Sequence, residues 1–296
     1  MTINRVTQGM MMDRSYLSLQ TGLSRLAKTQ EQLSTGRILN RPSDSPTGTT
    51  AAMRMRASLA DETQYSRNAE DGLGRLGQAD LTLSSMLDQV RRVNELAMRS
   101  VNTLNQNPAA REALAAEIDQ LREGLIDGAN ATYLGRPVFG GIVNGSAAYD
   151  TSGAFVGVQG DVQRTIGKGV RVSVNVDGPE AFGPDGANLF DTLKDLAASV
   201  RAGTTTTTQT GMASLDTARN RMTSALAEIG SRTNRLERAA QSAKDSVLDL
   251  TSSLSEIENV DLARATMDLK MQEVAYQAAL ASTARLVQPS LADFLR

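Results

Sequence analysis

The amino-terminal part of the chain carries apolar side chains at the spacing of a pairing helix. From Met12 to Leu33 they recur at intervals of three and four residues, which places them along one face of an α-helix. The predicted seam is Met12, Tyr16, Leu19, Leu23, Leu26, Gln30 and Leu33, with Gln30 as its one polar interruption. We therefore expect a first helix that packs along a partner helix.

Two further helices follow the same rule. The second is expected to begin at Pro46 or Thr47, and the third to run from about Pro108 to Ala129, where a proline suits the first helical position. The seam of the second helix is Leu73, Leu76, Leu83, Leu87, Val90, Ala97, Val101 and Leu104, with Asp80 and Asn94 as polar members. The third helix uses Leu114, Ile118, Leu121 and Leu125. The first part of the chain is thus predicted to be helical with two breaks.

The region from Tyr133 to about Gly186 changes character, because glycine becomes dense and the apolar period shortens to two. In KGVRVSVNVDG, valines alternate with polar residues from Val170 to Val176, which predicts a half-buried strand. GAFVGV and RPVFGGIV are expected to form shorter strands joined by turns. A small β region therefore interrupts the helices.

The remainder of the chain is predicted to be helical again. NLFDTLKDLAASVRAG forms a helix that Gly203 can close, and TTTTTQT is expected to be a loop. A last helical stretch runs from Met212 to about Val287, with a hinge near residues 258–261 where IENVD loosens the pattern. The fold class is mainly α with a small inserted β region, arranged as an elongated antiparallel coiled coil or bundle.

The stretch LSTGRILNRPSDSPTG, which begins at Leu33, breaks the helical pattern abruptly. Gly36 is suited to closing the first helix, and the two prolines of RPSDSP exclude helical backbone at the residues before them. Ser43, Asp44 and Ser45 can accept hydrogen bonds from the free N–H groups of the next helix. We interpret the stretch as a shaped connector between two helices; an ordinary loop is the alternative.

The carboxy-terminal segment VAYQAALASTARLVQPSLADFL is apolar around most of its circumference. A helix of this kind needs partners on most sides, and one antiparallel helix covers only one stripe. The uncovered side chains therefore point to other subunits, unless the terminal helices fold back on their own chain. The predicted interface residues are Leu19, Leu23, Leu26, Leu280, Leu286, Val287, Leu291 and Phe294.

Composition removes several kinds of chemistry. The 296 residues include no cysteine and no histidine, which excludes disulfides, thiol nucleophiles, ordinary zinc sites and imidazole catalysis. Aromatic residues make up 3%, which is thin for an enzyme core, and a net charge of -2 gives no general attraction for nucleic acid or an anionic membrane. The first residues lack the apolar core of a cleavable signal, and no segment predicts a membrane span. We expect a soluble protein without cofactor, metal or catalytic residues, whose export would use another route.

Two motifs match ligand sites poorly. In GDVQRTIGKG the glycine spacing is wrong for a phosphate loop, and Gly169 stands where a serine or threonine would bind magnesium. The acidic residues of VDGPEAFGPDG miss the alternate spacing of a calcium loop, so turn formation is the better account.

Three quoted motifs together resemble the flagellin superfamily. LSTGRILNRPSDSPTG is similar to its amino-terminal signature, NATYLGRPVFGG continues the match, and SEIENVDLARATMDLKMQEVAYQAALASTARLVQPSLADFLR is similar to its carboxy-terminal signature. The NRPSDSP form resembles the branch at the hook–filament junction. The matching positions are Leu33, Gly36, Asn40, Pro42, Ser43 and Asp44, then Ile257, Val260, Asp261 and Ala263 onward.

The resemblance implies a structural subunit of the bacterial flagellum rather than an enzyme. It implies an inner coiled-coil domain of residues 1–40 and 259–296, a helical rod domain of 41–132 and 188–258, and a small β domain of 133–187. It also implies synthesis in the cytoplasm, unfolded export by the flagellar type III system with a chaperone on the last helix, and a ring of like subunits between hook-associated protein 1 and flagellin. Flagellin itself, whose connector usually resembles an Ala-Lys-Asp-Asp run, is the nearest alternative, and a helical enzyme of unknown reaction is the remote one.

Overall fold

The computed structural model describes the backbone of residues 8–103, 107–143, 145 and 147–294, and the side chains of these residues except 8–9, 102–103 and 285–294. The chain divides into two compact units, residues 1–60 with 248–296 and residues 61–247. The predicted division into three domains stays a prediction. Helices α2 (Pro46–Thr103) and α6 (Thr205–Glu258) contribute to both units.

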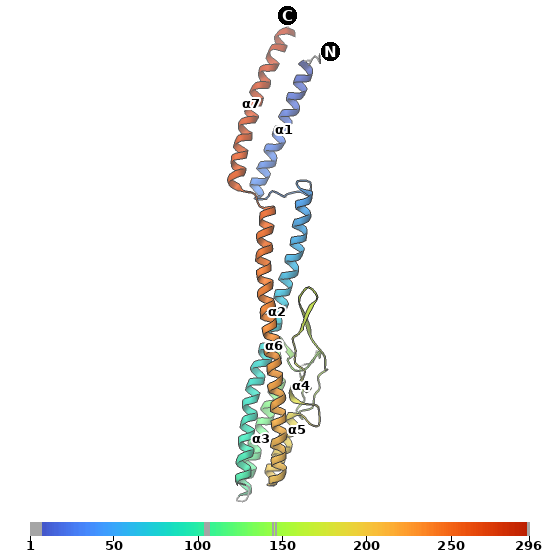
Figure 1. Ribbon diagram of the computed structural model, residues 1–296, viewed down its shortest axis with the longest axis vertical. Helices are drawn as coiled ribbons and strands as arrows, with labels where there is room; N and C mark the ends of the chain where they lie inside the picture. The colour runs from blue at the N-terminus through green and yellow to red at the C-terminus, as the bar shows by residue number, and fades with distance from the viewer. Residues whose placement is uncertain (1–7, 104–106, 144, 146, 295–296) are drawn as a thin grey trace. The chain divides into compact units, whose positions relative to one another are not determined.

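The first unit is built around the two terminal helices. Helix α1 (Gln8–Thr35) and helix α7 (Leu262–Phe294) lie side by side and antiparallel (Figure 1). The hydroxyl of Thr29 donates to Gln272 Oε1 at 3.1 Å across this pair. The same unit contains the start of α2 and the end of α6, where Arg56 forms an ion pair of 2.7 Å with the buried carboxylate of Glu258.

The second unit holds a continuous apolar core between helices. Helix α3 (Pro108–Ala129) packs on α5 (Leu189–Ala202), and the middle parts of α2 and α6 supply most of the remaining core. Fully buried side chains recur at helical spacing in each of these helices: Leu76, Leu83, Met86, Val90, Leu96, Ile118, Leu125, Leu193, Leu196, Leu215, Met222 and Leu236. Most of the predicted seam of α2 thus lies in the core, although Asp80 is exposed and Leu104 lies outside the described residues.

The β region consists of two small antiparallel hairpins. Strand β1 (Thr132–Tyr133) pairs with β2 (Arg136–Pro137), and β3 (Gln163–Gly167) pairs with β4 (Val170–Ser173). The predicted strand from Val170 is therefore shorter than expected, although Val174 and Val176 are buried. GAFVGV and RPVFGGIV contribute β2 and isolated bridges in place of full strands.

Aromatic residues hold this region together. Phe139, Tyr149, Phe155, Phe182 and Phe190 pack mostly edge to face, with ring centroids 5.0 to 5.7 Å apart. Phe182 belongs to the short helix α4 (Gly178–Phe182), which the sequence did not predict, and Phe190 belongs to α5. The scarce aromatic side chains are thus concentrated where the strands are too short to supply a core.

Most predicted helix limits are confirmed. Helices α2 and α3 begin at Pro46 and Pro108, Gly203 closes α5 with φ 73°, and α6 and α7 are separated at the predicted hinge. The prediction of a loop at TTTTTQT is wrong, because α6 begins at Thr205. Thr208 is fully buried and its hydroxyl donates to the carbonyl of Thr204, so packing overrides the weak helix propensity of threonine.

Three glycines of α2 face different surroundings. A Cβ at Gly72 would lie 2.8 Å from a methyl of Val174, and one at Gly74 would lie 2.8 Å from Cζ of Tyr133. A Cβ at Gly77 would meet nothing within 4 Å. Glycines at the first two positions therefore let the β region approach α2 closely, whereas Gly77 has no such role.

We predict that Gly74→Ala lowers the free energy of unfolding by about 1–3 kcal/mol, because the added methyl displaces Tyr133. The matched Gly77→Ala should raise it by up to about 1 kcal/mol through helix propensity alone. Urea unfolding of both variants measures the difference. Equal stabilisation by the two substitutions would show that the hairpin does not pack on α2 at Gly74.

Candidate functional site

The connector after α1 lies against the link between α6 and α7, within the first unit. The N–H of Ile38 donates to the carbonyl of Glu258 at 2.7 Å, and the N–H of Val260 donates to the carbonyl of Gly36 at 3.0 Å. Between these two bonds Arg37 and Asn259 form an antiparallel bridge. The two places where the chain leaves the terminal helix pair are therefore joined through their backbones.

The ends of the flanking helices are closed by local features. Gly36 follows α1 with φ 70°, a backbone angle that glycine adopts without strain. Ser45 stands at the N-cap of α2, where its hydroxyl accepts the N–H of Gly48 at 3.1 Å. Gly48 itself suits the cap, because a Cβ there would lie 2.9 Å from Ser45 Oγ.

Asp44 has a different role from the predicted one of capping α2. Its Oδ2 accepts the N–H groups of Asn40 and Arg41 at 3.2 and 2.9 Å, and its Oδ1 lies 2.9 Å from Nζ of Lys28 on α1. The Lys28 ammonium and the Arg41 N–H hold the pKa of Asp44 below its usual value. The carboxylate is therefore charged at neutral pH, and this interaction is lost as the pH falls through the lowered pKa.

The other predicted connector residues line the same turn. The side chain of Asn40 donates to the carbonyl of Arg37 at 3.1 Å, whereas Pro42 and Ser43 are exposed. Sequence reasoning placed the break before α7 but missed its cap, where Asp261 Oδ1 accepts the N–H of Arg264 at 3.1 Å. An aspartate three residues before this N–H is the usual sequence signal for such a cap.

The terminal helix pair buries a narrower face than the predicted seam. Leu19 and Leu26 are half-buried, while Thr29 is the most buried residue of α1. Leu23 is 51% exposed and Leu280 of α7 is 44% exposed. The side chains of Leu286, Val287, Leu291 and Phe294 lie outside the described residues.

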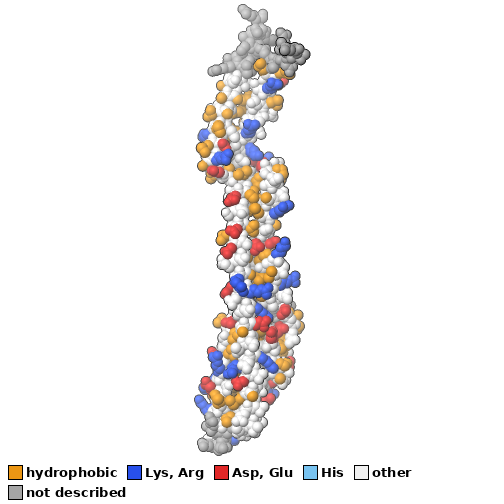
Figure 2. All heavy atoms as spheres, in the orientation of Figure 1, with side chains coloured by type: hydrophobic (Ala, Val, Ile, Leu, Met, Phe, Trp, Pro, Cys, Tyr) orange, Lys and Arg blue, Asp and Glu red, His pale blue; other side chains and the backbone are white. Residues whose placement is uncertain are grey.

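The outer face of this helix pair is rich in apolar side chains (Figure 2). Among the described side chains of α1 and α7, the large apolar ones that are exposed are Met10, Met11, Met12, Tyr16, Leu17, Leu23, Leu262, Met267, Met271, Val274 and Leu280. They are spread over the exposed sides of both helices, and we call this set the outer apolar face. Single apolar residues scattered over a surface are normal, but many large ones on two neighbouring helices are typical of a surface that another chain covers.

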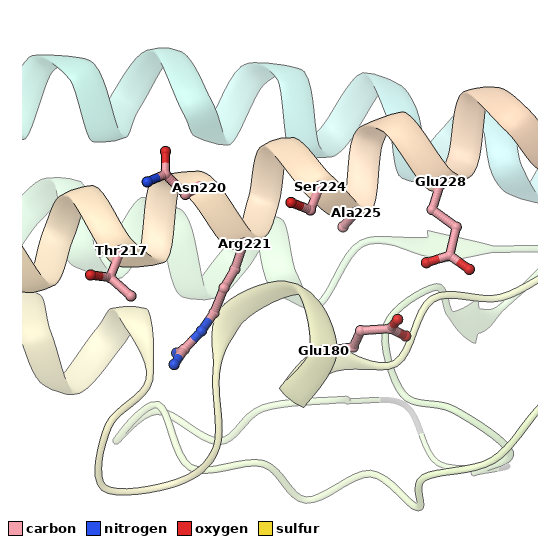
Figure 3. Close-up of a pocket in the computed structure, with 7 residues that line it drawn as sticks. All are labelled: Glu180, Thr217, Asn220, Arg221, Ser224, Ala225 and Glu228. Carbon is pink, nitrogen blue, oxygen red and sulfur yellow. The ribbon is translucent and has the colours of Figure 1, made fainter.

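An open hollow of about 360 Å³ lies in the second unit between α4 and α6. Figure 3 shows the carboxylates of Glu180 and Glu228 turned toward it from the two helices. Arg232 binds Glu228 and donates to the carbonyl of Asn175 at 2.6 Å. Burial, followed by the charge of Glu228, raises the pKa of Glu180. Sequence reasoning missed this pair, because its members lie on separate elements.

No group of three or more acidic side chains among the described residues is arranged to hold a metal ion. Across the described ranges, no helix combines the length and apolar character that a membrane crossing requires.

The paired terminal helices, the capped connector and the small β insertion define a mainly helical protein with a small β region. The family model of the bacterial flagellin N-terminal helical region matches residues 6–143, and that of the bacterial flagellin C-terminal helical region matches residues 212–295. The chain therefore belongs to the flagellin family.

Curated relatives include two kinds of flagellar protein. The flagellar hook-associated protein 3 of Escherichia coli (strain K12) is 25% identical over 93% of this chain and 94% of the relative. A flagellin of Bacillus subtilis (strain 168) is 27% identical over 91% of this chain and 92% of the relative. Sequence identity alone therefore does not decide between a hook-associated protein 3 and a flagellin.

Solved structures share the fold. FlgL of Bacillus cereus superposes with a TM-score of 0.60 at 21% identity, over 68% of this chain and 99% of that one. The flagellar hook-associated protein-3 of Legionella pneumophila gives 0.61 at 14% identity, over 69% of this chain and 98% of that one. A mainly helical fold with a small β region is thus confirmed.

We predict that Ser45→Ala costs the start of α2 about 0.5–2 kcal/mol, because the Gly48 N–H loses its acceptor. Amide hydrogen exchange at Gly48 should become faster, whereas Ser43→Ala, a change at the exposed neighbour, should leave it unaltered. Unchanged exchange in Ser45→Ala would mean that the cap contributes nothing.

We also predict a pH-dependent effect at the hollow. Because the pKa of Glu180 is raised on folding, the folded state takes up a proton more readily, and stability falls as the pH rises from 4.5 through the raised value. The charged groups facing Glu180 are Glu228, Arg232 and Asp177.

Glu180→Gln removes this unfavourable charge. The variant should therefore melt above the parent at pH 7, and thermal unfolding between pH 7 and 4 should show the gap closing. Glu237→Gln, on the exposed side of α6, controls for the loss of one negative charge. A difference in melting temperature between variant and parent that stays constant with pH would contradict a raised pKa of Glu180.

Proposed function

We propose that this chain is a structural subunit of the bacterial flagellum that forms the junction between hook and filament. Family membership supports a flagellar structural role, and the relative named flagellar hook-associated protein 3 spans nearly the whole chain. The proposal places the mature protein outside the cell, after synthesis in the cytoplasm and export by the flagellar type III system.

The observation that carries the proposal is the outer apolar face of α1 and α7. One helix pair leaves this face exposed, although each of its side chains would contribute favourable free energy if covered. Copies of the same chain, arranged as a ring, would cover it with the same kind of helix pair. This explains why the two ends of the chain are apolar on more sides than one partner can bury.

A position between hook and filament implies two further partners. A junction subunit contacts hook-associated protein 1 on one side and the first flagellin subunits on the other. Before export, an apolar helix needs protection in the cytoplasm, so we assign a chaperone to α7, at Leu280 and the predicted residues that follow it. The chaperone and neighbouring subunits would use the same apolar anchors in succession.

Flagellin is the second candidate function, because a flagellin is 27% identical over 91% of this chain. The connector sequence RPSDSP favours the junction. Both functions share the paired terminal helices, so a direct test must separate a junction from a filament subunit.

Deletion of the gene in its own bacterium makes this separation. A junction subunit predicts hooks that lack filaments under the electron microscope, with flagellin released into the medium, and recovery when the gene is returned. Absence of flagellin from both cell surface and medium would instead assign the chain as the filament subunit. Normal filaments in the deletion strain would reject both functions.

A further inference from the structure

We propose that Asp44 is a positioning residue, which fixes the direction of α1 through its ion pair with Lys28 and thereby prepares the terminal helix pair for assembly. The part that concerns assembly rests on the proposed function. The part that concerns the position of α1 rests on contacts within residues 1–60, which belong to one compact unit.

The Asp44 carboxylate joins donors from two elements. Two donors are backbone N–H groups of its own turn, at Asn40 and Arg41, and the third is the Lys28 ammonium of α1. The turn is also closed by the N–H of Asp44, which donates to the carbonyl of Arg41 at 3.0 Å. The connector thus holds its carboxylate in place for a side chain of the preceding helix.

This ion pair differs from an ordinary surface pair. Exposed pairs contribute little, because two long side chains must be ordered and water screens their charges. The Asp44 side chain is 15% exposed and already ordered by the turn, so that Lys28 alone loses freedom on binding. The nearby pair of Arg41 and Glu31, at 3.3 Å, joins the same two elements but has side chains 69% and 39% exposed.

The backbone pairing of the connector does not by itself orient α1. The bonds of Gly36 and Ile38 join the connector to the α6–α7 link, and Gly36 allows rotation just after α1 ends. The packing of α1 on α7 and the hydrogen bond that Gln32 donates to the carbonyl of Ile38 at 3.4 Å also limit this rotation, but neither reaches the turn that leads into α2. Lys28 lies seven residues before the end of α1 at Thr35, and its pair with Asp44 reaches this turn.

The experiment measures the distance between α1 and α2 in the full chain. Since the protein has no cysteine, Ser24→Cys and Ser58→Cys, both at exposed positions, provide unique sites for spin labels. Asp44→Asn keeps an acceptor for the two N–H groups and removes the charge, and Lys28→Met removes the other charge. Lys28→Arg keeps the charge, and Glu31→Gln breaks the more exposed pair as a matched control.

We expect a narrow distance distribution in the parent, in Lys28→Arg and in Glu31→Gln. Its width should increase about twofold in Asp44→Asn and in Lys28→Met, and no further in the double variant, because both substitutions remove one interaction. A parent as broad as Lys28→Met, or equal widths in Lys28→Met and Glu31→Gln, would overturn the positioning role.

Assembly is scored separately, by counting hooks that carry filaments in cells producing each variant at parental levels. Filamented hooks should fall severalfold in Asp44→Asn and Lys28→Met and remain at the parental number in Lys28→Arg and Glu31→Gln. Broad distributions with normal filaments would overturn the link to assembly. Normal filaments in the deletion strain would instead reject the proposed function, while the spin-label result would still decide the positioning role.

Discussion

The first unit depends on the backbone hydrogen bonds that join two segments, the connector after α1 and the link between α6 and α7. Thr29 and Gln272 meet across the terminal helices although they are 243 positions apart in the chain. The chain must therefore leave α1 and return to α7 at one place, and backbone bonds of Ile38 and Val260 join these two segments. Without them, closing so long a loop would leave the terminal helices a large conformational freedom.

Short polar side chains order the helix ends that flank these two segments. Ser45 begins α2 and Asp261 begins α7, each by accepting an N–H of the first turn. Asp44 orders the turn between α1 and α2, and Glu258 forms an ion pair with Arg56 at the end of α6. Polar groups thus specify where helices begin and end, while apolar side chains supply the surface through which the proposed assembly would form.

The helices and their limits could be predicted because local rules set them. Pro46 and Pro108 suit first helical positions, Gly36 suits the backbone after a helix, and Ser45 is a preferred cap. The long apolar seam of α2 also indicated the core, since an apolar period repeated over many turns is a strong sequence signal.

The remaining features depend on tertiary contacts. The seam of α1 was placed wrongly at Tyr16, which is 68% exposed, because the buried face alternates Leu19 and Leu26 with the small Gly22 and the polar Thr29, which give no apolar signal. The helical threonine tract and the meeting of Glu180 with Glu228 likewise follow from packing between distant segments. Asp44 could be selected as important, but its partner Lys28 could not, since both flanking helices offer charged residues.

Hydrogen exchange at the amides of Ile38 and Val260, followed by NMR in the full chain, tests the central claim most directly. If the connector and the α6–α7 link are joined, both amides should be protected from exchange to a similar degree, at a level comparable with the ends of α1 and α7. Exchange of both amides at the rate of an unstructured peptide, while the middle of α1 and α7 remains protected, would contradict the account.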